Sequence, residues 1–153
     1  MMRRTVFGVL LLMFLTAAPA AAQRHVGIRA GASADPDQFF FGAHAETSPL
    51  IEHLTFRPNL EVGVGNDLTL FALNVEFAYW IPVRNKPISV YLGAGPAAVI
   101  ASRDGGRGGD GTDVGGGFNV LVGIQHRRGL FTELKVGVAD SPNLKVAVGF
   151  SFR

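Results

Sequence analysis

Histidine and serine are the side chains of this sequence that could form a catalytic pair. The chain has 153 residues and no cysteine, which excludes a cysteine nucleophile, a thiolate metal site and a disulfide framework. A histidine base must lie within hydrogen-bond reach of its serine. His53 and His126 fall in or beside expected turns, His25 stands at the start of the first expected strand, and we expect no serine at the height of His44. We therefore expect no catalytic residues and no enzymatic activity.

The run GGRGGD at residues 105–110 matches the first six positions of a calcium-binding nonapeptide repeat. That calcium site is built between stacked copies of the repeat, and this chain has a single copy. We expect the segment from Ser102 to Asp113 to be a solvated, extracellular surface loop. The sequence predicts no metal site and no cofactor.

The charge balance gives no support to nucleic-acid binding. Two of the 14 basic side chains, Arg3 and Arg4, lie among the first 22 residues, and without them the basic side chains equal the 12 acidic ones. A nucleic-acid-binding domain usually carries a basic excess. We therefore expect no nucleic-acid partner.

The N-terminus has the pattern of a secretory signal peptide. Residues 1–4 form a short positive segment, residues 6–15 are apolar, and small residues precede a cleavage site between Ala22 and Gln23. The apolar stretch is shorter than the ~20 residues of a membrane-spanning helix. We expect residues 1–22 to be removed and residues 23–153 to form one domain.

From residue 24 onward the apolar residues recur at every second position, which predicts strands. Short connections rich in turn residues favour antiparallel neighbours. The expected strands are 25–32, 38–46, 54–65, 68–80, 88–101, 114–125, 130–138 and 144–152. The predicted fold is all-β: a single closed, antiparallel, up-and-down β-barrel of about eight strands.

The two faces of these strands differ in composition. One face is apolar and aromatic. The other face carries most of the 20 glycines together with four cations and four carboxylates. Glycine weakens strands and has no advantage on a solvated surface, whereas a narrow interior needs small residues and paired charges. We therefore predict that the polar face lines the barrel interior, the lumen, and that the apolar face meets lipid. The predicted lumen charges are Arg29, Glu46, Arg57, Glu61, Glu76, Glu133, Lys135 and Lys145.

Turn geometry and strand facing predict two of the charge contacts. If Asn66 and Asp67 form a two-residue turn, Arg57 lies opposite Glu76, and we expect an ion pair between them. A three-residue turn at residues 127–129, with Gly129 at a positive φ, also places Gln125 opposite Phe131. Glu133 and Lys135 share one strand face. Eight strands leave little free space inside, so we expect these charges to plug the lumen. A selectivity filter for a pore is the alternative function of the same charges.

The chain resembles the small eight-stranded outer-membrane β-barrel family, the group that includes the OmpA membrane domain and OmpX. The last strand is similar to the C-terminal assembly signal of that family, with Lys145 followed by the alternating aromatics Phe150 and Phe152. Ala147 stands where the family favours glycine, and Arg153 follows the last aromatic. The resemblance implies an outer-membrane location, both termini in the periplasm, and contact of the last strand with the assembly machinery.

The resulting functional hypothesis is a monomeric outer-membrane barrel that contacts lipid and has a structural or surface-interaction role. Aromatic residues are expected near both membrane interfaces, with Tyr79, Trp80 and Phe56 near the periplasmic one. A soluble periplasmic barrel that binds an apolar ligand is one alternative. An outer-membrane lipid-modifying enzyme is a second.

Overall fold

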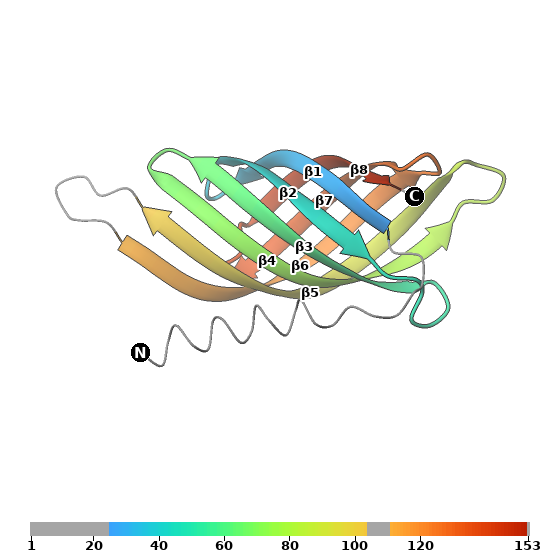
Figure 1. Ribbon diagram of the computed structural model, residues 1–153, viewed down its shortest axis with the longest axis horizontal. Helices are drawn as coiled ribbons and strands as arrows, with labels where there is room; N and C mark the ends of the chain where they lie inside the picture. The colour runs from blue at the N-terminus through green and yellow to red at the C-terminus, as the bar shows by residue number, and fades with distance from the viewer. Residues whose placement is uncertain (1–24, 104–110, 153) are drawn as a thin grey trace.

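The computed structural model describes residues 25–103 and 111–152 (Figure 1). The expected signal peptide, its cleavage site and the run GGRGGD lie outside these residues. The described chain consists of eight strands joined by turns and short connections. The strands are β1 (His25–Ala34), β2 (Gln38–Glu46), β3 (Leu54–Gly65), β4 (Leu68–Pro82), β5 (Ile88–Arg103), β6 (Gly111–His126), β7 (Leu130–Ala139) and β8 (Leu144–Phe152).

The strands form a closed barrel in sequence order. Each strand pairs antiparallel with the next, and β8 pairs antiparallel with β1 to close the sheet. The predicted fold class is confirmed, and the observed strands contain all eight predicted ranges. In the described part of the chain, no helix is long and apolar enough to cross a membrane.

The two predicted turns have the expected geometry. Asp67 has a φ of 56° in the turn between β3 and β4, which sets Arg57 opposite Glu76. Gly129 has a φ of 107° in the turn between β6 and β7, a conformation that glycine adopts without strain. Gln125 accordingly pairs with Phe131, as the sequence predicts.

The connection between β5 and β6 differs from the expectation. The hairpin continues to the pair Arg103 and Gly111, so both ends of the expected Ser102 to Asp113 loop belong to strands. Side-chain alternation fails to predict this extension because Thr112 and Asp113 are polar, whereas the ladder needs only their backbone groups.

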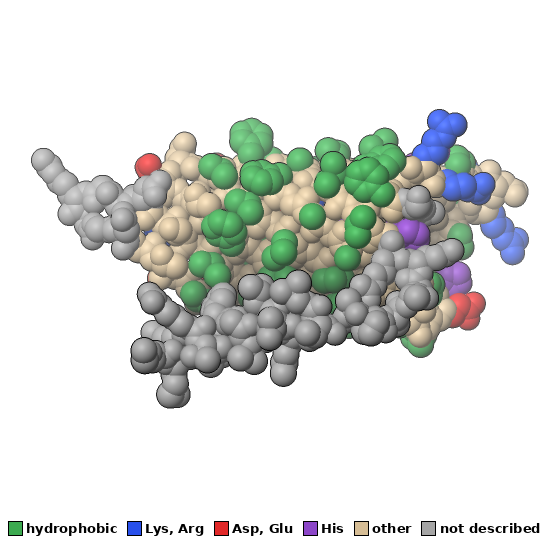
Figure 2. Space-filling view, in the orientation of Figure 1, with side chains coloured by type: hydrophobic (Ala, Val, Ile, Leu, Met, Phe, Trp, Pro, Cys, Tyr) green, Lys and Arg blue, Asp and Glu red, His purple; other side chains and the backbone are tan. Residues whose placement is uncertain are grey.

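The apolar face covers the outside of the barrel. Figure 2 shows hydrophobic side chains distributed over the visible part of the wall. Phe39 is 79% exposed and Val120 is 56% exposed, values typical of side chains that face the surroundings. Other exposed apolar residues come from every strand: Val26, Ile28, Phe41, Leu60, Phe71, Phe77, Leu92, Phe118, Val122, Leu134, Val136, Val146, Val148, Phe150 and Phe152.

Polar residues fill the interior, so burial is inverted relative to a water-soluble barrel. All eight predicted lumen charges are buried. The buried polar and charged residues of the strands are Arg29, Gln38, His44, Glu46, Thr55, Arg57, Asn59, Glu61, Asn74, Glu76, Asn119, Gln125, Glu133, Lys135, Lys145 and Ser151.

Trp80 lies near the end of β4 beside Tyr79, but it faces the interior of the barrel. Its indole packs against Tyr91 at a centroid distance of 4.6 Å, and its Nε1 donates a hydrogen bond to Thr55 Oγ1 at 2.9 Å. Trp80 alternates with Tyr79, which is 47% exposed on the outer wall. The tryptophan therefore belongs to the inner face, whereas Tyr79 faces outward.

Candidate functional site: the charged lumen and its mouth

The carboxylate of Glu133 on β7 contacts two arginines, a tyrosine and a lysine. Its Oε1 accepts a hydrogen bond from Arg29 Nη1 at 3.0 Å, and its Oε2 accepts one from Arg57 Nη1 at 3.2 Å. The Tyr91 hydroxyl donates to Oε2 at 2.8 Å. The expected contact with Lys135 is present at 3.8 Å. Glu133 thus ties β1, β3, β5 and β7 together across the lumen.

Glu61 on β3 forms a second centre of charge. Lys145 donates a hydrogen bond to Oε2, and Lys135 Nζ lies 3.4 Å from Oε1. Arg29 Nη1 lies 3.4 Å from the same Oε1. Because Arg29 and Lys135 contact both Glu61 and Glu133, the two centres form one network.

The predicted ion pair between Arg57 and Glu76 is wrong, although their register is right. Glu76 Oε1 lies 2.6 Å from Lys135 Nζ, whereas Arg57 extends to Glu133 and, at 4.0 Å, to Glu46. Register places backbones side by side, but a long side chain on an inner wall can cross the lumen. Arg57 therefore pairs with Glu133 on β7, and Glu76 on β4 pairs with Lys135 instead.

Aromatic rings hold the cations in place, and each ring lies over a glycine. The Arg57 guanidinium sits 4.7 Å from the Tyr91 centroid and 4.8 Å from the Phe131 centroid, within the range of cation–π attraction. Tyr91 pairs with Gly123, and Phe131 pairs with Gly149. A Cβ on Gly123 would lie 2.1 Å from Tyr91 Cζ. These glycines are therefore required for lumen packing. The sequence indicates this role, because strand alternation places them on the inner face.

Three asparagines carry the network around the wall. Asn119 Nδ2 donates to Asn74 Oδ1 at 2.8 Å, and Asn74 Nδ2 donates to Asn59 Oδ1 at 2.7 Å. Asn59 Nδ2 in turn donates to Glu76 Oε2 at 2.7 Å. The alternation of the sequence places these asparagines inside, and the pairing of β5 with both β4 and β6 brings Asn119 to Asn74.

A small apolar layer accompanies the charges inside the lumen. It consists of Leu70 and Ala72 on β4 and Ala97 and Val99 on β5, all buried. Such a layer holds no polar group that could coordinate a passing ion or water molecule.

His44 and Ser151 are joined by a hydrogen bond, which corrects the expectation that no serine lies at the height of His44. Nε2 and Oγ are 3.0 Å apart, and both residues are buried. Gly27 pairs with both residues, so the histidine reaches across a strand that has no side chain there. The register of β1 with β8, which closes the barrel, brings the pair together. Hairpin turns do not specify this register, because β1 and β8 are not joined by a turn.

The His44–Ser151 pair lacks the arrangement of an activated nucleophile. A base of this kind is oriented by a third group bonded to its other ring nitrogen. His44 Nδ1 has no hydrogen-bond partner among the described residues. The ring instead packs edge-on against Phe131 at 5.3 Å. His53 and His126 lie in or beside turns, as expected.

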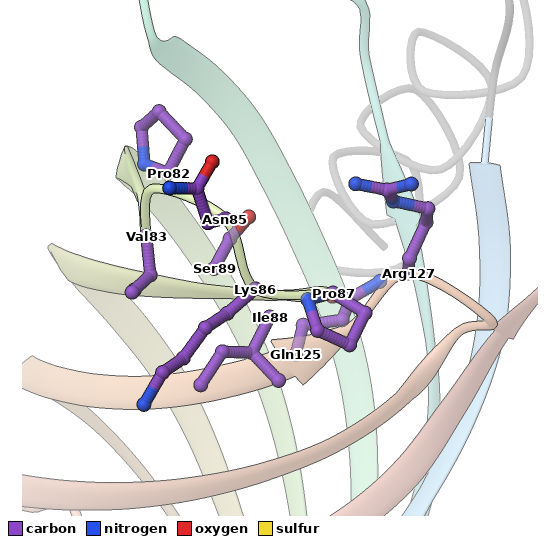
Figure 3. Close-up of a pocket in the computed structure, with 9 residues that line it drawn as sticks. All are labelled: Pro82, Val83, Asn85, Lys86, Pro87, Ile88, Ser89, Gln125 and Arg127. Atoms are coloured by element: carbon purple, nitrogen blue, oxygen red, sulfur yellow. The ribbon is translucent and has the colours of Figure 1, made fainter.

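A pocket of about 600 Å³ lies at the mouth of the barrel, at the end where β4 and β6 finish (Figure 3). The turn between β4 and β5 forms most of its lining, and Gln125 and Arg127 complete it. Among residues 25–103 and 111–152, no three His, Asp or Glu side chains come together in a way that could hold a metal ion.

Comparison with known proteins gives matches of structure without matches of sequence. No protein-family model and no curated protein sequence matches this chain. The N-terminal β-barrel domain of OprF from Pseudomonas aeruginosa superposes with a TM-score of 0.66 and 11% identity, over 84% of this chain and 96% of that one. Neisserial surface protein A gives a TM-score of 0.58 and 18% identity, over 84% of this chain and 96% of the other.

These neighbours decide the fold. The chain has the fold of the small outer-membrane β-barrels. The resemblance to the OmpA and OmpX group is confirmed at the level of fold. An outer-membrane barrel fold also explains why the apolar wall faces outward. The alternative of a soluble barrel with an apolar ligand inside is contradicted, because charged and amide side chains occupy the interior.

Proposed function

We propose that this outer-membrane barrel is a monomer with a closed lumen and a structural or surface-interaction role, without transport and without catalysis. The observation that carries the proposal is the inverted burial. All eight strands contribute apolar side chains to the outer wall, which suits contact with hydrocarbon. The closed sheet also satisfies its backbone hydrogen bonds internally, as a membrane requires. The interior then has to be polar and internally paired.

The closed lumen rests on the partners of the buried charges. A path for ions would have to separate Glu133 from Arg29 and Arg57, or Glu61 from Lys135 and Lys145. Leaving one buried charge without its partner costs about 3–5 kcal/mol. The buried apolar layer of Leu70, Ala72, Ala97 and Val99 fills part of the same interior.

Conductance across planar bilayers tests the closed lumen. The folded protein should insert without giving steady current, because no continuous polar path avoids the charge network. A stable conductance proportional to voltage would contradict the plug and favour the selectivity filter.

We assign the periplasm to the end that holds the start of β1 and the finish of β8. An even number of strands brings both ends of the described chain to the same end of the barrel. An impermeant thiol reagent applied to intact cells should label Asn66→Cys, in the turn between β3 and β4. It should leave Arg84→Cys, at the other end, unlabelled. The opposite pattern would reverse the orientation.

We also propose that β8 contacts the assembly machinery before the barrel closes. Phe150 and Phe152 lie on the outer face with centroids 5.2 Å apart and are available to a partner within the membrane. Lys145 is buried against Glu61 in the closed barrel, so any contact it makes with the machinery precedes closure.

A further inference from the structure

The mouth pocket lies between two turns that are tied together. Arg127 N donates a hydrogen bond to Pro87 O at 2.7 Å, which joins the β6–β7 turn to the β4–β5 turn. Within the first turn, Lys86 N donates to Val83 O at 3.3 Å. Proline at positions 82 and 87 restricts the backbone further. The pocket is therefore preformed by backbone contacts rather than by flexible side chains.

The pocket opens on the lumen side of the wall. Ser89 and Gln125 are register partners on the inner face, and both line the pocket. Tyr91 follows Ser89 along the same face and is fully buried. The pocket is thus the outermost part of the lumen, above the aromatic and charged network.

Gln125 supplies an amide that the protein itself does not use. The residue is 2% exposed, and neither its Oε1 nor its Nε2 has a hydrogen-bond partner among the described residues. In Figure 3 its side chain lies beneath Pro87, between the turn and Arg127. A primary amide offers one acceptor and two donor hydrogens, the combination that matches a peptide group.

Two cations flank the pocket without ion-pair partners in the described chain. Lys86 and Arg127 are exposed, and no carboxylate of residues 25–103 or 111–152 lies within 4.0 Å of either. Figure 3 shows their charged ends on opposite sides of Pro87. Figure 2 shows that Lys and Arg side chains gather at this end of the barrel. A ligand that engages both cations must carry two separated acidic groups.

We propose that the mouth pocket binds an acidic peptide, whose carboxylates pair with Lys86 and Arg127 and whose backbone amide hydrogen-bonds to Gln125. A phosphate headgroup of the bilayer would satisfy the cations, but it would leave the amide unused and would approach from the wall instead of the lumen. The proposal depends on the assigned orientation only for the compartment, the periplasm, that supplies the peptide.

The test is fluorescence anisotropy with the folded protein in uncharged detergent. The probe is the amidated tripeptide Glu-Ala-Glu with an N-terminal fluorophore. Lys86→Gln and Arg127→Gln should each weaken binding about threefold, as expected for exposed ion pairs, and the double variant about tenfold. Gln125→Leu should weaken binding without lowering stability, because the amide makes no internal hydrogen bond to lose.

A matched control removes the same charge outside the pocket. Arg84 and Arg128 lie in the same two turns but do not line the pocket. The double variant R84Q/R128Q should change the affinity less than about twofold, since such charges act only at long range. Equal losses in the two double variants would overturn the proposal in favour of diffuse charge attraction. Equal binding of the tripeptide Gln-Ala-Gln would overturn it as well.

A competition experiment separates the peptide from a headgroup. Unlabelled Glu-Ala-Glu should displace the probe at lower concentration than glycerol phosphate does. Displacement by glycerol phosphate at the lower concentration would overturn the peptide proposal and assign the pocket to a phosphate group.

Discussion

At the scale of single residues, Arg57 pairs across the lumen with Glu133 and not with Glu76, its register neighbour. Removing Arg57 or Glu133 leaves a buried charge with fewer partners, at a cost on the order of 3 kcal/mol. In a double-mutant cycle with alanine, the two losses should be non-additive by more than 0.5 kcal/mol, about the limit for independent sites. Urea-dependent unfolding from lipid vesicles gives the free energies.

The cycle of Arg57 with Glu76 is the matched control. Both residues lie in the same register pair, yet they belong to different ion pairs. Strong coupling of Arg57 with Glu76, together with additivity of Arg57 and Glu133, would show that register decides the pairing and that the observed network is wrong.

Glycines of the inner wall give a second prediction at this scale. Gly123→Ala places a Cβ 2.1 Å from the Tyr91 ring, which should lower the unfolding free energy by about 1–3 kcal/mol through overpacking. Gly116→Ala on the same strand meets only Ala97 O at 3.8 Å and should be nearly neutral. Both variants add one methyl group to β6, at position 123 on the inner face and at position 116 on the outer face. Similar losses in both would contradict the packing of Tyr91 on Gly123.

At the scale of strands, alternation in the sequence predicts all eight elements and the face of each predicted lumen charge. Hairpin register follows because the turns at Asn66 and at Gly129 have few geometries. The ion-pair partners of Arg57 do not follow, since they depend on side chains that cross the lumen. The contact of His44 with Ser151 depends on how β8 closes on β1, and no local signal specifies that register.

The last strand carries the prediction that belongs to this scale. Phe152→Ala should reduce the amount of barrel inserted in cells several-fold, because it removes an outer-face aromatic from the proposed assembly signal. It should change folding of the purified chain into detergent only slightly. Val148→Ala, on the same outer face of β8, is the control. Equal effects of both substitutions in cells would argue against recognition of the C-terminal aromatic.

At the scale of the whole molecule, the distribution of side chains between wall and lumen determines both the fold and its environment. Every strand contributes apolar residues to the outside and small or polar residues to the inside. A water-soluble protein with the same sheet would reverse the two faces. The ends of the barrel also differ, because the basic turns surround the mouth pocket while Asp35, Asp67 and Asp140 lie at the other end.

The location of the outer wall in hydrocarbon is the central claim, and one thiol tests it. The chain has no cysteine, so Val120→Cys on β6 introduces a unique site on the wall, and Asn66→Cys places the control in the turn between β3 and β4. A fluorophore on Cys at position 120 in protein folded into vesicles should be quenched by lipids that carry quenchers on their acyl chains. The control at position 66 should be quenched much less. Efficient reaction of the thiol at position 120 with an impermeant reagent in the folded protein, without lipid quenching, would contradict the membrane barrel.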